Sequence, residues 1–277
     1  MLINGIPTTQ ISALDRGLCY GDGLFETLAI INGKPRLWPQ HMERLKAGCL
    51  RLGLIMPDVT LIEQEILGLT ATDTFATVPC VAKIILTRRQ GGRGYRSSGS
   101  GECNRIISLF AWPDYPSSFD QGITVRWCHT RLGLNPALAG IKHLNRLEQV
   151  MGRSEWQDDS IAEGLMLDQQ GQVIEGTMSN LFIVKGQQLL TSILDQCGIQ
   201  GIIRQLIYND RIGHGLAVTE QHLEQKDVLE ADEVFICNSL IGLWPVVHLH
   251  DKQTPKHYDV GDVSQHIRTA LQSYWQT

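Results

Sequence analysis

The order of apolar and polar positions predicts a chain in which strands and helices alternate. Short apolar runs bounded by glycine, asparagine or proline are typical of strands. Runs of this kind cover residues 24–31, 81–87, 105–112, 123–129, 164–168, 173–175, 181–184 and 233–237. Apolar residues spaced three or four apart predict helices instead. That spacing occurs from Pro39 to Gly53, from Val59 onward, and over residues 144–151, 202–214 and 263–274.

One stretch interrupts this pattern and predicts a domain boundary. Residues 112–118 read Trp-Pro-Asp-Tyr-Pro-Ser-Ser, with two prolines, two serines and no periodicity. We therefore predict an N-terminal domain over 1–112, a linker over 113–121 and a C-terminal domain over 122–277.

Composition and residue spacing argue against several classes of protein. The 277 residues are 43% hydrophobic and carry a net charge of −5, with no basic block that suggests a nucleic-acid surface. No apolar run approaches the roughly 20 residues that cross a bilayer, and the N-terminus has no signal-peptide pattern. The seven cysteines are scattered and form no Cys-x-x-Cys pair, and the nine histidines show no metal-ligand spacing. These features predict a cytoplasmic protein with reduced thiols and no bound metal.

A single lysine is the candidate nucleophile. Lys142 is the only lysine between Lys83 and Lys185 and follows the pair Ala139-Gly140. A lysine shielded by apolar neighbours loses its proton more readily and then forms Schiff bases, although most lysines are solvated surface residues. We predict that Lys142 lies at the entrance of the helix over 144–151.

Three distant features give this lysine a context. Arg44 lies beside the apolar stripe of its helix, where an inward guanidinium needs a carboxylate or a phosphate. Glu175 ends a predicted strand, and Gly201 precedes a helix whose first N–H groups suit a phosphate. Together with Lys142, these groups suit pyridoxal 5′-phosphate, an aldehyde that carries a phosphate and a ring nitrogen.

The chain resembles a known family of enzymes. Arg44 in His-Met-Glu-Arg-Leu, Lys142 in Lys-x-x-Asn, Glu175 in Glu-Gly-Thr-Met-Ser-Asn and the run Gly201-Ile-Ile-Arg match, in order and spacing, the fold-type IV pyridoxal-phosphate enzymes. That family includes branched-chain aminotransferases, D-amino-acid transaminases and aminodeoxychorismate lyases. The resemblance implies an α+β homodimer. Its smaller N-terminal α/β domain is followed by a larger C-terminal domain with a β-barrel core flanked by helices.

The resemblance also assigns roles to residues. Lys142 becomes the Schiff-base residue and general base and acid, and Glu175 the partner of the pyridine nitrogen. The remaining cofactor contacts that it implies are Arg44, Ser239 and the backbone of Ile202 and Ile203 for the phosphate, and Ile199 against the ring. The aminotransferases of the family often have threonine at the position of Ile203, so here only the backbone N–H could serve.

Two further stretches are similar to the lyase branch of the family. They are residues 91–95, Gly-Gly-Arg-Gly-Tyr, and the segment from Arg131 to Val150. This branch implies conversion of 4-amino-4-deoxychorismate into 4-aminobenzoate and pyruvate, a step of folate biosynthesis. Substrate contacts are expected from Phe25, Thr27, Arg93 and Arg131, with Glu26 also in the substrate-facing stretch. The loop arginines are as compatible with a solvated loop as with a substrate site.

Two other functions remain open from sequence. An aminotransferase acting on D-amino acids or branched-chain amino acids would use the same cofactor residues and differ only in its substrate pocket. A binding or scaffold protein that kept the fold without catalysis is the second alternative, and the joint presence of Lys142, Glu175 and Arg44 argues against it.

Overall fold

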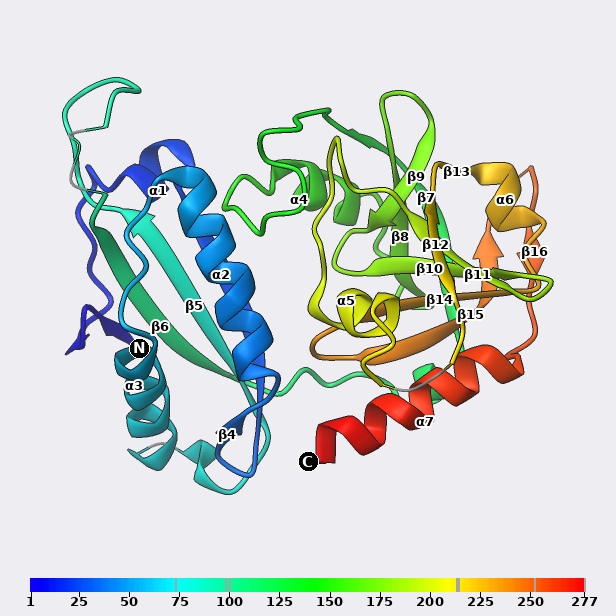
Figure 1. Cartoon of the computed structure of the whole chain (residues 1–277), viewed down its shortest axis with the longest axis horizontal. Helices are drawn as coiled ribbons and strands as arrows, with labels where there is room; N and C mark the ends of the chain where they lie inside the picture. Colours follow the sequence, from blue (N-terminus) through cyan, green and yellow to red (C-terminus); the bar gives the residue numbers. More distant parts are fainter. Residues whose placement is uncertain (73, 98, 100, 213–214, 252, 277) are drawn as a thin grey trace. The chain divides into compact units, whose positions relative to one another are not determined.

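The computed structural model describes residues 1–72, 74–97, 99, 101–212, 215–251 and 253–276, and they form two compact units (Figure 1). Unit 1 comprises Met1–Asp114 together with Ile141–Asn145, and unit 2 comprises Tyr115–Gly140 and Arg146–Thr277. The change of unit after Asp114 falls inside the stretch that we predicted as a linker. The segment Ile141–Asn145 was expected in the second domain, but its contacts group it with unit 1.

Unit 1 is built on one antiparallel sheet with the strand order β2-β1-β6-β5-β3-β4. Helix α2 packs against β3 and α3 against β6. The elements of this unit are β1 (Leu2–Ile3), β2 (Ile6–Pro7), α1 (Arg16–Tyr20), β3 (Gly23–Ile31), β4 (Lys34–Pro35), α2 (Trp38–Leu52), α3 (Val59–Thr72), η1 (Thr74–Ala76), β5 (Cys80–Arg88) and β6 (Cys103–Ala111).

Helix α2 forms where the apolar spacing predicted it. Pro39 lies in its first turn, where a missing N–H costs no hydrogen bond. Met42, Leu45 and Cys49 are buried, as the stripe predicted, and Gly53 ends the helix in the left-handed conformation. The buried face of α2 therefore lies against the sheet strand β3, which carries several predicted site residues.

Unit 2 contains a closed barrel of six strands. The ring runs β10-β14-β15-β7-β8-β9 and closes because β9 pairs with β10. The elements of this unit are η2 (Ser117–Gln121), β7 (Ile123–Leu132), α4 (Leu147–Arg153), β8 (Ile161–Asp168), β9 (Gln172–Gly176), β10 (Asn180–Lys185), β11 (Gln188–Ser192), α5 (Ile202–Tyr208), β12 (Val218–Gln221), β13 (Leu223–Glu224), α6 (Gln225–Leu229), β14 (Glu233–Asn238), β15 (Gly242–His250), β16 (Lys256–His257) and α7 (Asp262–Gln276). This architecture confirms the predicted fold class.

Packing in the barrel explains why its strands appear in the sequence as unbroken apolar runs. Leu181 and Ile183 of β10 pack in one buried cluster with residues of β7, β8 and β14. Phe182, on the other side of β10, stacks on Phe235 of β14 with ring centroids 5.2 Å apart. Since both faces of these strands are covered, alternation of polar and apolar residues disappears.

Two helices differ from the prediction. Helix α4 begins at Leu147 instead of Leu144, and its apolar residues Leu147, Val150 and Met151 are 75%, 58% and 59% exposed. The spacing predicted a helix here, and a helix forms, but its apolar residues are not part of the protein core. Helix α5 ends at Tyr208, and His214, where we expected its end, lies outside the described residues. No helix in the described part of the chain is both long and apolar enough to span a membrane.

Candidate active site

Lys142 lies on a short extended segment that pairs with the start of β3. Its carbonyl oxygen accepts the N–H of Phe25 at 3.0 Å, and the Leu144 N–H donates to the carbonyl of Gly23 at 3.0 Å. Leu24 and His143 form an antiparallel bridge between these bonds. The predicted position at a helix entrance is wrong, because α4 begins five residues later. The two hydrogen bonds to β3 hold the backbone of Lys142 in place.

The Lys142 side chain lies over an aromatic ring of the same unit. Its Nζ is 4.3 Å from the centroid of the Phe25 ring, and Lys83 Nζ lies 5.4 Å from the same centroid. Phe25 and Thr27 are half-buried on β3, on the opposite face from the buried Glu26. The structure thus brings Lys142 to the predicted substrate residue Phe25, and Thr27 lies on the same face of β3 as Phe25. Glu26 points to the other face and is not among them.

Glu26 instead binds Arg44, the predicted phosphate ligand. Arg44 Nε and Nη2 donate to the two Glu26 oxygens at 2.8 and 2.6 Å, and His41 Nδ1 lies 2.7 Å from Oε2. The sequence required a carboxylate or a phosphate for this guanidinium, and the carboxylate is present within the protein. Burial opposes ionisation of Glu26, but the charges and hydrogen bonds of Arg44 and His41 outweigh it and lower its pKa to about 2.

His41 adds an unusual feature to this cluster. Its side chain is fully buried, and burial lowers its pKa, against the opposing influence of Glu26. The positive charge of Lys142 also contributes to this lowering, which places the cluster within electrostatic reach of the lysine. His41 Nε2 is buried without a hydrogen-bond partner among the described residues.

In unit 2, Glu175 is buried at the junction of β9 and β10. Its Oε2 accepts the N–H of Ile199 at 2.8 Å and lies 3.4 Å from Asn180 Nδ2. Gly198, the residue before Ile199, has φ +84°. A Cβ on Gly198 would lie 3.3 Å from Glu175 Oε2. The predicted ring-nitrogen partner Glu175 and the predicted ring contact Ile199 are therefore adjacent.

The predicted phosphate contacts of unit 2 lie at the start of α5 and at the end of β14. Ile202 and Ile203 open α5, their side chains are buried, and the N-cap residue Gly201 has no side chain to cap the helix. Ser239 is half-buried and follows Asn238, whose Oδ1 accepts the N–H groups of Leu240 and Ile241. This turn fixes the backbone around Ser239.

Sequence reasoning missed a second buried carboxylate below this site. Glu163 of β8 is fully buried and accepts hydrogen bonds from Thr177 Oγ1, Ser179 Oγ and the N–H groups of Gly164, Thr177 and Met178. The turn that follows Glu175 is thereby held from inside the barrel. The available signal was a lone acid in the apolar run 161–167.

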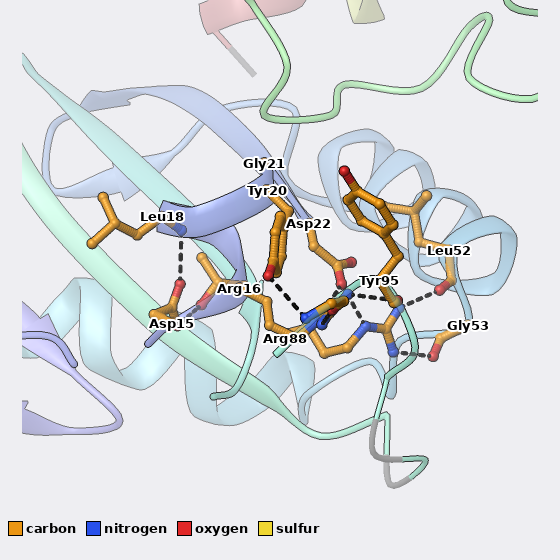
Figure 2. A network of polar contacts seen from close by, with 12 residues as sticks. Asp15, Arg16, Leu18, Tyr20, Gly21, Asp22, Leu52, Gly53, Arg88 and Tyr95 are labelled. Atoms are coloured by element: carbon orange, nitrogen blue, oxygen red, sulfur yellow. Dashed lines mark hydrogen bonds and ion pairs between the residues drawn. The ribbon is translucent and has the colours of Figure 1, made fainter. Parts of the chain in front are cut away.

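The loop with the predicted substrate arginine Arg93 is anchored at its base (Figure 2). Arg16 is buried and donates to the carbonyl oxygens of Gly94 and Tyr95 at 3.0 and 2.9 Å. Arg16 Nε and Arg88 Nε both bind Asp22 Oδ2 at 2.9 Å. Arg93 itself is exposed, so this anchor holds the backbone and leaves the Arg93 guanidinium at the surface.

The other predicted substrate arginine belongs to the other unit. Arg131 is exposed near the end of β7 in unit 2. The structure therefore gathers the predicted residues into two groups. Unit 1 holds Phe25, Thr27, Arg44, Arg93 and Lys142, whereas unit 2 holds Arg131, Glu175, Ile199, Ile202, Ile203 and Ser239.

Comparisons with known proteins match almost the whole chain. The model of the amino-transferase class IV family matches residues 23–249. Aminodeoxychorismate lyase of Vibrio harveyi is 34% identical over 270 residues, which cover 97% of this chain and 98% of the relative. The crystal structure of 4-amino-4-deoxychorismate lyase from Pseudomonas aeruginosa is 40% identical, covers 98% of both chains and superposes with a TM-score of 0.90.

More distant relatives carry other activities. D-alanine aminotransferase of Listeria monocytogenes serotype 1/2a (strain 10403S) is 27% identical over 247 residues, which cover 86% of this chain and 82% of the relative. The family match spans both units and includes the segments of Arg44, Lys142, Glu175 and Ser239. This chain belongs to the amino-transferase class IV family.

Proposed function

We propose that this protein is a pyridoxal-phosphate-dependent lyase that converts 4-amino-4-deoxychorismate into 4-aminobenzoate and pyruvate. The observation that carries the proposal is the 40% identity to the Pseudomonas lyase over 98% of both chains. The aminotransferase relative matches less of the chain at 27% identity. The lone lysine Lys142 and the buried Glu175 supply the two groups that this chemistry requires.

The residues present fit pyridoxal phosphate. Lys142 is the amine that would carry the aldehyde, and Glu175 would hold the ring nitrogen, with Ile199 against the ring. Arg44, the N–H groups of Ile202 and Ile203, and Ser239 would bind the phosphate. The buried Glu175 supports this fit, because the Ile199 N–H and the Asn180 amide hold its carboxylate in place, and a protonated ring nitrogen is a suitable partner for it.

The chemistry follows from these assignments. When bound, pyridoxal phosphate withdraws electrons from the substrate carbon that loses a proton. Lys142 Nζ takes that proton from the carbon that bears the substrate nitrogen. The C–O bond to the enolpyruvyl group then breaks, and the substrate ring becomes aromatic. Lys142 then holds this proton and can donate it to the departing enolpyruvate, which becomes pyruvate. Glu175 would keep the ring nitrogen protonated and so maintain the ring as an electron acceptor.

A coupled assay tests the proposal. A synthase that produces 4-amino-4-deoxychorismate is mixed with the purified protein, and 4-aminobenzoate and pyruvate are quantified together. We expect the two products in equal amounts and only in the presence of the protein. Product formation with pyruvate absent would contradict a lyase.

An aminotransferase is the second candidate, favoured by the D-alanine aminotransferase relatives. Incubation with D-alanine and 2-oxoglutarate would then yield D-glutamate. We expect this activity to be far below the lyase activity in the same preparation.

Glu175→Gln should slow the reaction by about 100-fold in kcat with little change in KM. The amide keeps the shape and removes the charge, and a charge-assisted hydrogen bond contributes about 1.5–3 kcal/mol. Steady-state kinetics on the cofactor-saturated protein measure the effect. Asp195→Asn, an exposed acid on the loop before Ile199, is the matched control and should leave kcat unchanged. A Glu175→Gln protein with wild-type kcat would contradict the role of Glu175.

The protein is further proposed to act as a homodimer in the cytoplasm. Leu147, Val150 and Met151 expose a continuous apolar face on α4, which a monomer rarely leaves in water. A second copy of the chain is the simplest cover, since most oligomers of soluble proteins are symmetric homo-oligomers. None of the seven cysteines forms a disulfide, which suits a reducing compartment.

Leu147→Glu should shift the protein from dimer to monomer, because a charge would then be buried without a partner at the interface. Analytical ultracentrifugation at micromolar concentration measures the change. Leu50→Glu provides the control, because Leu50 is the one large apolar residue exposed among the described residues of α2 and so forms no apolar face like that of α4. A wild-type protein that sediments as a monomer would refute the assembly.

A further inference from the structure

Asn180 occupies a central place between the proposed cofactor contacts of unit 2. It opens β10 and pairs directly with Glu175 of β9 in the bridge that closes the barrel. Its side chain is buried. Residues opposite each other across an antiparallel pair keep a fixed separation, so the backbone itself sets Asn180 beside Glu175.

Three hydrogen bonds use both ends of the Asn180 amide. Nδ2 donates to the carbonyl oxygen of Ile199 at 2.8 Å and lies 3.4 Å from Glu175 Oε2. Oδ1 accepts the N–H of Gly201 at 3.0 Å. One side chain therefore touches the carboxylate of Glu175 and both ends of the turn Ile199–Gly201.

The turn is shaped around this amide. A Cβ on Gly201 would lie only 2.1 Å from Asn180 Oδ1, so any larger residue would displace the side chain. The Ile199 N–H donates to Glu175 Oε2 at 2.8 Å, so Asn180, Glu175 and Ile199 are all hydrogen-bonded to one another. Gly140 also binds this turn. Its N–H donates to the Gly198 carbonyl, and its carbonyl oxygen accepts the Gln200 N–H.

We propose that Asn180 is a positioning residue that fixes the Glu175 carboxylate and the Ile199–Gly201 turn relative to each other, and thereby sets the affinity for pyridoxal phosphate. The proposal rests on the proposed function in that this cofactor occupies the site. Asparagine suits the task because its amide donates and accepts in one plane. Aspartate could accept from Gly201 but could donate to neither Ile199 nor Glu175.

The test uses Asn180→Ala and Asn180→Asp in the full-length holoenzyme. The dissociation constant for pyridoxal phosphate is measured from cofactor release on dilution, and the visible spectrum of the bound cofactor is recorded. We expect Asn180→Ala to raise the dissociation constant about tenfold or more, because the three hydrogen bonds that hold Glu175, Ile199 and Gly201 together are lost. Asn180→Asp should alter the spectrum as well, since a second carboxylate beside Glu175 favours protonation of the pair.

The matched control is Asn209→Ala, at the opposite, exposed end of α5. It should bind the cofactor as the wild type does. If either Asn180 variant has a lower Tm but keeps the wild-type dissociation constant and spectrum, its role is structural only and the proposal is overturned. A wild-type protein that binds the cofactor without forming 4-aminobenzoate overturns the substrate assignment alone. A wild-type protein that binds no pyridoxal phosphate overturns both.

Discussion

Lys142→Ala should abolish turnover, lowering kcat by at least about 1,000-fold while the protein stays folded. The variant loses both the covalent attachment of the cofactor and the proton acceptor, and proton transfer alone contributes roughly 100- to 10,000-fold. Stability should hardly change, because the backbone bonds of residue 142 to Phe25 do not involve its side chain. Product formation with excess cofactor and a thermal unfolding curve measure the two quantities.

Lys83→Ala is the matched control for that experiment. Lys83 also places its Nζ near the Phe25 ring, at 5.4 Å from the centroid compared with 4.3 Å for Lys142. A general loss of positive charge near Phe25 would therefore affect both variants. We expect Lys83→Ala to keep activity within about tenfold of the wild type, since no proton-transfer role is lost. Near-wild-type turnover by Lys142→Ala would refute the central role of this lysine.

Glu26→Gln should destabilise the protein by about 3 kcal/mol at pH 7. The pKa of Glu26 falls from 4.5 to about 2 on folding, and each unit corresponds to about 1.36 kcal/mol. A lowered folded-state pKa means that this stabilisation is fully present above pH 4.5 and is lost as pH falls through about 2. The difference in unfolding free energy between Glu26→Gln and the wild type should therefore shrink across that interval.

Urea unfolding at pH 7, 4 and 3 measures this dependence. Glu102→Gln is the control, because Glu102 forms an exposed ion pair with Arg89 and such pairs contribute little. It should change the unfolding free energy by less than about 0.5 kcal/mol. A Glu26→Gln effect that stays constant from pH 7 to pH 3 would show that the charge of Glu26 does not support the fold.

The sequence predicted the parts of this protein whose signals are local. The apolar spacing of Met42, Leu45 and Cys49 predicted the buried face of α2, which the structure confirms. At α4 the same spacing also predicted a helix, which forms, but its apolar residues Leu147, Val150 and Met151 are exposed. Spacing identifies an apolar face and not what covers it, so a helix that packs on another chain looks the same as one that packs on its own core.

Contacts between residues that are far apart in the chain could not be predicted from the sequence. Arg44 required an anion, but nothing in the pattern distinguished a phosphate from Glu26, which lies 18 residues earlier and on the neighbouring strand. Asn180 stood in the quoted motif around Glu175 without a role, because its bonds to Ile199 and Gly201 depend on barrel closure. Glu163 was missed for the same reason. Its donors in Thr177–Ser179 come from the turn after the next strand.

The most direct test compares two reactions in one preparation of the wild-type protein. The kcat/KM for 4-aminobenzoate formation from 4-amino-4-deoxychorismate is measured beside the kcat/KM for D-glutamate formation from D-alanine and 2-oxoglutarate. We expect the first to exceed the second by at least about 100-fold, a difference of about 2.7 kcal/mol in transition-state stabilisation. Efficient D-glutamate formation without 4-aminobenzoate would contradict the account and make the protein an aminotransferase.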